Sequence, residues 1–175
     1  HQILPPIGLE IPSSLFPRVY LNITVDQPED APETLVLPVA GSTAKKLFAA
    51  ELEQIGMSEE MNLRIAGTRF EDDMEHLRHV SSQSSKIPPN AFLNLLIDEL
   101  LWLALYSRKI ISADSGLLWL VTAFLNDRVS HGLLGKKQYP EIVVVRKDHK
   151  RGVPAYAIWH PLLVFSGKLD WIRGI

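Results

Sequence analysis

The sequence contains no cysteine, and this absence excludes disulfide bonds, thiolate nucleophiles and cysteine-ligated zinc or iron–sulfur centres. It also lacks an uninterrupted apolar run of about 20 residues, the length that a membrane-spanning helix needs. The strongly apolar stretches 93–105 and 117–125 are interrupted by charge or too short. We therefore expect buried helices there and no membrane span. The compartment stays unassigned, with an intracellular one favoured.

The chain also lacks a strong excess of charge. Its net charge of −2 and charged fraction of 22% argue against a disordered tail and against nucleic-acid binding by bulk charge alone. The charge is unevenly distributed, because residues 1–97 carry thirteen acidic and seven basic residues while residues 98–175 carry seven and eleven. This asymmetry favours a chain of two parts.

The sequence contains enough apolar residues to form a folded core. The 175 residues are 46% hydrophobic, which is typical of one or two compact globular units. The chain begins at His1 and not at methionine, so we expect a fragment or a processed product of a larger protein.

The first half predicts a hairpin, a helix and a short strand. Residues 1–17 are rich in proline and read as an extended segment. Residues 18–25 alternate apolar and polar side chains, and 34–39 can continue as a second strand, so we expect a hairpin in which Pro38 marks an unpaired side or an early end. Residues 42–55 then predict a helix, and residues 62–66 predict a short strand. We expect Ser42 or Thr43 to cap this helix. Its apolar stripe consists of Ala44, Leu47, Phe48, Leu52 and Ile55.

The second half contains one ambiguous stretch. Residues 92–97 read as a strand, but periodicity alone also permits one helix over 91–106. Residues 117–128 predict a second helix. Residues 141–145 and 153–161 predict a second hairpin around a basic turn, and the tail can add a short strand.

One motif in the first half resembles a known family. We expect Ala66-Gly67 to form a turn and Phe70 and Leu77 to be buried in the core. The acidic pair Glu71-Asp72 lies between these two apolar residues. This order resembles the β-grasp fold of ubiquitin-like domains over residues 18–97. The resemblance implies an α+β fold in which one helix crosses a mixed sheet, and a helical pair with a basic β-hairpin over 98–175 docks on that domain. Arg64 stands where the family carries an apolar partner-binding residue.

Two histidines three residues apart are the candidate metal ligands. His76 and His79 have a spacing that puts both rings on one helical face, and the carboxylates Asp72, Asp73 and Glu75 lie nearby. A metal-dependent enzyme at His76 and His79 is therefore one alternative. The competing interpretation is a solvated acidic loop, and we favour it, so that no metal, cofactor or catalytic residue is assigned.

Two further motifs have structural explanations. Gly41-Ser42-Thr43 opens the predicted helix and such a helix start attracts anions, but the phosphate-loop pattern is missing and helix capping suffices. Asp114 and Ser115 have no GxSxG elbow around them. We expect this pair to start the following helix.

The basic turn of the second hairpin is a candidate nucleic-acid site. Its six cations are Lys136, Lys137, Arg146, Lys147, Lys150 and Arg151. A hairpin after two helices can act as a wing that contacts phosphates. Nucleic-acid binding through residues 136–151 is the first alternative function, and a solvated turn is the interpretation that we favour.

The preferred interpretation is a protein–protein interaction or adaptor module. Trp102 and Trp119 belong to apolar faces larger than a short helical pair can bury, so we expect part of them at an interface. We expect the partner to be another protein or another domain of the same protein. The candidate interaction residues are Arg64, Arg146, Lys147, Lys150, Arg151, Trp102 and Trp119.

Overall fold

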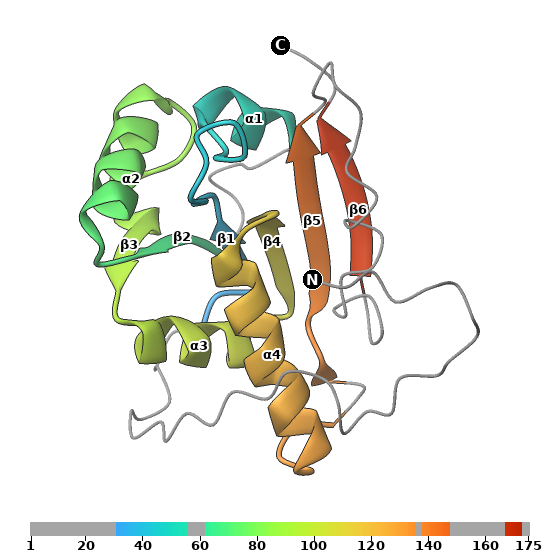
Figure 1. Ribbon diagram of the computed structural model, residues 1–175. Coiled ribbons are helices and arrows are strands. Elements are labelled where there is room, and N and C mark those ends of the chain that lie inside the picture. Colours follow the sequence, from blue (N-terminus) through green and yellow to red (C-terminus); the bar gives the residue numbers. More distant parts are fainter. Residues whose placement is uncertain (1–30, 56–61, 136–137, 148–166, 173–175) are drawn as a thin grey trace.

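One parallel sheet organises the molecule. The computed structural model describes residues 31–55, 62–135, 138–147 and 167–172. These residues form a six-stranded sheet with the order β3-β2-β1-β4-β5-β6, and all neighbouring strands are parallel. The strands are β1 (Thr34–Leu37), β2 (Leu63–Thr68), β3 (Phe92–Leu95), β4 (Lys109–Ala113), β5 (Glu141–Lys147) and β6 (Gly167–Ile172). Figure 1 shows β5 and β6 side by side, with their arrowheads at the same end.

A helix follows each of the first four strands. The helices are α1 (Ala49–Gln54), α2 (Glu71–Gln83), α3 (Ile97–Tyr106) and α4 (Gly116–Ser130), and a 3₁₀ turn, Pro89–Ala91, precedes β3. This alternation is the βαβ pattern by which parallel strands are joined. The architecture is therefore α/β. In the described residues no helix is long and apolar enough to cross a membrane.

The sheet separates two apolar layers, because successive strand residues point to opposite faces. Val36 of β1 packs in the layer with α1 and α2, whereas its neighbours Leu35 and Leu37 pack in the layer with α3 and α4. The same alternation holds in β4, where Ile111 and Ile110 face opposite layers. All four residues of β1 are buried, as expected for a strand that helices cover on both faces.

The predicted β-grasp fold is wrong, because that fold has a mixed sheet and every strand pair here is parallel. The hairpin predicted for residues 18–25 and 34–39 fails for the same reason, since both edges of β1 are already paired, one with β2 and one with β4. Residues 18–25 themselves lie outside the described residues. Of the two meanings given to Pro38, the early end applies, because β1 ends at Leu37.

The second predicted hairpin is also wrong. β5 lies between β4 and β6, and it is parallel to both, so it has no edge left for an antiparallel partner along residues 142–145. Residues 153–161, the predicted partner strand, lie outside the described residues. The tail does contain a strand, β6, as the sequence predicted.

Several individual elements are confirmed and others are corrected. The strands predicted at 62–66 and 92–97 and the helix at 117–128 are present as β2, β3 and α4, so the stretch 91–106 is a strand followed by a helix. The helix predicted from residue 42 begins only at Ala49. The acidic stretch predicted as a loop is α2, and the strand β4 was missed. The predicted domain boundary after residue 97 falls in the first turn of α3, and strands from both sides of it pair in one sheet.

Candidate functional site

The strand order reverses between β1 and β4. From β1 the chain proceeds to β2 and β3 on one side, and it then returns to place β4 on the other side of β1. The connection after β1 leads to α1 in one layer, and the connection after β4 leads to α4 in the opposite layer. In open parallel sheets, ligands bind outside the carboxyl ends of the strands at such a reversal. We call residues 38–48 and 114–116 the switch-point site.

The first part of the switch-point site is the segment 38–48. The Leu47 N–H donates to the carbonyl of Pro38 (2.9 Å), so the segment folds back on itself. At its tip the N–H groups of Lys45 and Lys46 donate to the carbonyl of Ser42 (2.9 and 3.2 Å). Residues 41–44 are exposed, and a Cβ atom on Gly41 would meet no atom within 4 Å. The segment is thus anchored at its base and open to solvent at its tip.

The second part is the start of α4. Asp114 follows β4 directly, and the Ser115 Oγ accepts the Leu118 N–H (3.3 Å), which caps the helix. A Cβ atom on Gly116 would also meet no atom within 4 Å. Because the peptide dipoles of a 15-residue helix add up, this end carries a partial positive charge.

A charge pair joins the two parts. The Lys45 Nζ lies 3.4 Å from Asp114 Oδ2. The Lys45 side chain is 37% exposed and that of Asp114 is 10% exposed. Two residues that lie 69 positions apart in the sequence are therefore brought together where the strand order reverses, and the Lys45 side chain stays partly exposed there.

A second cluster fastens α1 to the end of β5. Glu51 Oε1 lies 2.6 Å from the Lys147 Nζ, and its other oxygen accepts the Phe48 N–H (2.6 Å). The Lys147 ammonium lies 4.6 Å from the centroid of the Phe48 ring, within the range of a cation–π interaction. Both charged side chains are largely buried, with Glu51 10% and Lys147 17% exposed.

His76 of α2 reaches the same segment from the other side. Its Nε2 lies 3.0 Å from the Leu47 carbonyl, so in the neutral ring the Nε2–H donates this hydrogen bond. The His76 and His79 rings meet the Phe48 ring edge-on, with centroids 5.1 and 6.0 Å away. Burial lowers the pKa of His76 below its usual value, and the charges of Lys46 and His79 lower it further against the opposing effects of the Leu47 hydrogen bond and the Asp73 charge.

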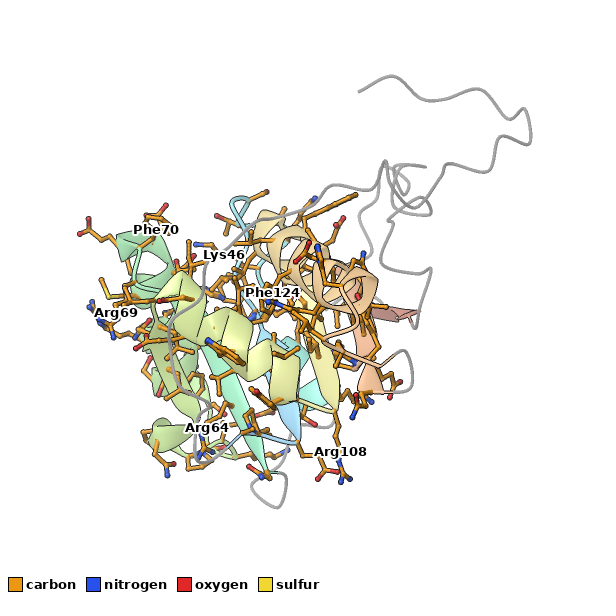
Figure 2. The ribbon with its side chains drawn as sticks, turned by 90° about the horizontal axis from the view of Figure 1, so that it is seen from below. Lys46, Arg64, Arg69, Phe70, Arg108 and Phe124 are labelled. Atoms are coloured by element: carbon orange, nitrogen blue, oxygen red, sulfur yellow. The ribbon has the colours of Figure 1, made fainter. Side chains whose placement is uncertain are left out.

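The predicted interaction residues do not gather at one place. Arg64 lies near the start of β2 and donates to the Leu63 carbonyl (3.1 Å). Figure 2 shows Arg64 and Arg108 together at one end of the molecule, away from Lys46, Arg69 and Phe70. Of the six cations of the predicted basic turn only Lys147 has a described side chain, and it is engaged with Glu51. Lys136, Lys137, Lys150 and Arg151 lie outside the described residues, as does the Arg146 side chain.

The two tryptophans have different surroundings. Trp102 of α3 stacks on Tyr106 of the same helix, with centroids 5.4 Å apart and an interplanar angle of 6°. Trp119 of α4 is exposed. Trp102 is half-buried with a buried indole nitrogen, so of the two residues Trp119 remains a candidate surface residue of the layer that α3 and α4 form.

The acidic stretch does not make a metal site. In the described part of the chain, no group of three histidine and carboxylate side chains is placed to hold a metal ion. His76 is turned toward Leu47, and Asp73 Oδ2 accepts the N–H and the hydroxyl of Thr68 (3.1 and 2.6 Å). The prediction that these carboxylates are merely solvated is wrong for Asp73, because this residue ties the start of α2 to the end of β2.

The sequence interpretation missed the pair of Lys45 with Asp114, and it did not single out Glu51, the partner of Lys147. The local signals were visible, since a Gly-Ser-Thr tip and an Asp-Ser pair each precede a helix. Both were interpreted as caps. The strand β4 was not predicted. Without it, the sequence does not show that segments 38–48 and 114–116 both follow parallel strands and therefore lie at the same edge of the sheet.

Comparison of the chain with known protein families, curated proteins and solved structures found no match. No ubiquitin-like domain is identified by these comparisons. The functional argument therefore rests on the site itself.

Proposed function

We propose that this protein binds a small anionic ligand, one that carries a phosphate or a similar oxyanion group, at the switch-point site. The observation that carries the proposal is the Lys45–Asp114 pair, which joins the connections after β1 and β4 at the reversal of strand order. This is the position at which open parallel sheets hold their ligands. The proposal thus combines a fold-level analogy with one local observation.

Most groups around the site favour negative charge, and the Asp114 carboxylate that pairs with Lys45 opposes it. Lys45 and Lys46 contribute ammonium groups, and the exposed tip of segment 38–48 offers backbone N–H groups and the hydroxyls of Ser42 and Thr43. The start of α4 adds a partial positive charge. The segment contains one glycine and no GxGxxG pattern, so nothing in it specifies a dinucleotide.

The first test compares two lysines of equal exposure. Lys45 and Lys109 are both 37% exposed and both pair with a carboxylate, but Lys109 lies at the amino end of β4. We expect Lys45→Met to weaken binding of inorganic pyrophosphate roughly tenfold to a hundredfold, because one charge-assisted hydrogen bond is lost. We expect Lys109→Met to leave it unchanged. Isothermal titration calorimetry at constant ionic strength measures both affinities.

Two results contradict the proposal. One is an unaltered chain that shows no saturable pyrophosphate binding. The other is an equal loss of affinity in both variants, because that is the behaviour of non-specific attraction to surface charge.

Interaction with another protein is the second candidate function, and an apolar patch favours it. Phe70 is 67% exposed, and Leu96 and Ile97 are exposed beside it. These residues follow the ends of β2 and β3, which are hydrogen-bonded neighbours. In the described part of the chain β3 pairs only with β2, and residues 88–97 carry no charge that would discourage pairing at its free edge. The occupant that fits an uncharged free edge is a second copy of the chain.

Sedimentation velocity tests this second candidate. We expect the unaltered chain to form dimers as its concentration rises into the range of tens to hundreds of micromolar, typical of weak interfaces. Leu96→Glu is expected to keep the chain monomeric, because it places a charge at the free edge. A chain that stays monomeric without the substitution rules out this occupant.

A further inference from the structure

Phe48 lies where three elements meet, and each element fastens the end of segment 38–48. Glu51 of α1 accepts the Phe48 N–H, Lys147 of β5 covers the Phe48 ring, and His76 of α2 binds the Leu47 carbonyl. Lys45 lies only two residues before Leu47. The position of the switch-point lysine therefore depends on how the end of its segment is held.

Of these three interactions, only the hydrogen bond between His76 and the Leu47 carbonyl involves a group that titrates near neutral pH. The neutral imidazole donates its Nε2–H to Leu47, and a second proton would have to enter a buried ring at Nδ1. Burial of a charge is costly unless an opposite charge compensates it.

The charged groups that face His76 supply little of that compensation. Lys46 from the segment, Lys147 from β5 across the Phe48 ring, and His79 from α2 are all basic. The Asp73 charge raises the pKa of His76, but this effect is smaller than the lowering effects of burial, Lys46 and His79, and Asp73 is also bonded to Thr68. Glu51 is paired with Lys147. Protonation of His76 is thus unfavourable while the segment stays in place.

We propose that His76 is a positioning residue for the switch-point site, which fastens segment 38–48 while it is neutral and releases the segment when it is protonated. Anion binding then weakens on acidification, because Lys45 moves with the segment. This inference rests on the proposed anion-binding function. The release of the segment is a property of the protein alone, and it is measured without a ligand.

The direction of the pH dependence follows from linkage. The pKa of His76 is lowered in the folded protein, chiefly by burial, from the value of 6.5 of a free imidazole. The released state therefore binds the additional proton more readily, and the fastening is complete above about pH 6.5. Below that pH the released population grows, by at most about tenfold for each pH unit, until the pH reaches the lowered pKa of His76 in the folded protein.

Hydrogen exchange of the full chain tests the release. The reporters are the N–H groups of Leu47 and Phe48, which bond to the Pro38 carbonyl and to Glu51. We expect their protection factors, corrected for intrinsic exchange, to fall between pH 7.5 and pH 5.5, by at most about tenfold for a one-proton linkage. The Ile111 N–H in the buried strand β4 serves as the internal reference, and its protection should exceed that of the segment at both values.

Two variants separate the titration from other effects of acid. His76→Gln keeps an N–H donor for the Leu47 carbonyl but cannot be protonated, so we expect the pH dependence of the segment to vanish. The matched control is His79→Gln, because His79 is exposed and lies on the same helix. This control should keep the pH dependence. If His76→Gln does not fold, the NMR titration of the His76 ring in the unaltered chain takes its place, and its midpoint must coincide with that of segment release.

Binding of inorganic sulfate in the same proteins connects release to function, because the charge of sulfate does not change between the two pH values. Weaker binding at pH 5.5 that is restored by His76→Gln supports the proposal. Protection factors that do not change with pH, or that change equally in His76→Gln, overturn it. Release that follows His76 without sulfate binding at either pH supports the fastening role and overturns the proposed function instead.

Discussion

The Lys147→Met substitution is expected to lower the free energy of unfolding by about 3–5 kcal/mol, the cost of leaving one partner of a buried ion pair alone. The expectation rests on the position of Glu51, whose side chain is 10% exposed and lies 2.6 Å from the Lys147 ammonium. After the substitution Glu51 keeps only the hydrogen bond from the neutral Phe48 N–H among the contacts described above. The remaining hydrogen bond places the cost toward the lower end of this range.

A double-mutant cycle isolates the pair. Glu51→Gln removes the charge and keeps an oxygen that can accept the Phe48 N–H. We expect the double variant Glu51→Gln with Lys147→Met to be more stable than the sum of the two single losses predicts, because neither residue then leaves an uncompensated charge. Urea denaturation measures all four proteins, and urea is preferable to guanidinium because it does not screen ion pairs.

The control for the cycle is an exposed pair. Lys109 lies 3.8 Å from Glu141, whose side chain is 51% exposed. Such surface pairs contribute about 0–1 kcal/mol, so Lys109→Met should cost little. A loss for Lys147→Met no larger than the loss for Lys109→Met would show that the buried pair adds nothing to the attachment of α1 to β5.

Local patterns identified many elements but not the way in which they pair. The apolar runs at 62–66, 92–97 and 117–128 gave the correct element types, because burial imposes its own periodicity on the sequence. The direction of the strands is decided by partners far away in the chain. The run 34–37 is compatible with a half-buried hairpin strand, and only its burial on both faces identifies a central parallel strand.

The resemblance to the β-grasp fold failed at particular residues. Leu77 is buried as expected, but Phe70 is exposed and does not anchor a turn. Gly67 lies inside β2, and a Cβ atom there would come within 3.1 Å of Val39 and 3.2 Å of Leu77. Close packing of α2 against the sheet explains why this position is a glycine. The Ala66-Gly67 motif therefore has a different physical cause here from the turn that the resemblance implied.

The candidate site was half visible in the sequence. A helix start that attracts anions was predicted around Gly41, where the structure has the exposed tip of segment 38–48 and no helix before Ala49, and a helix cap was correctly predicted around Ser115. The Lys45–Asp114 pair requires that both follow central strands, and this depended on the strand β4. Its sequence, KIISA, is short and begins with a charged residue, so it does not stand out from a loop by composition.

The second large effect is expected in the layer that α3 and α4 form. Phe124 of α4 is among the largest fully buried side chains, with an exposed fraction of 0%. We expect Phe124→Ala to lower the free energy of unfolding by about 3–5 kcal/mol, through lost burial and the cavity that remains. Phe124→Leu removes less volume, so it should cost about 1–3 kcal/mol. Urea denaturation monitored by tryptophan fluorescence gives the free energies of unfolding of both variants.

The matched control for this layer is Leu133, which follows α4 and is 66% exposed. Leu133→Ala should change the free energy of unfolding by no more than about 0.5 kcal/mol, as for surface substitutions without special contacts. The Arg128 guanidinium lies 4.7 Å from the Phe124 ring centroid, so Phe124→Ala also removes a cation–π partner. If Phe124→Ala costs as little as Leu133→Ala, α4 is not held on the sheet through this side chain, and the start of α4 at the switch-point site must be fixed by its cap and by Lys45 instead.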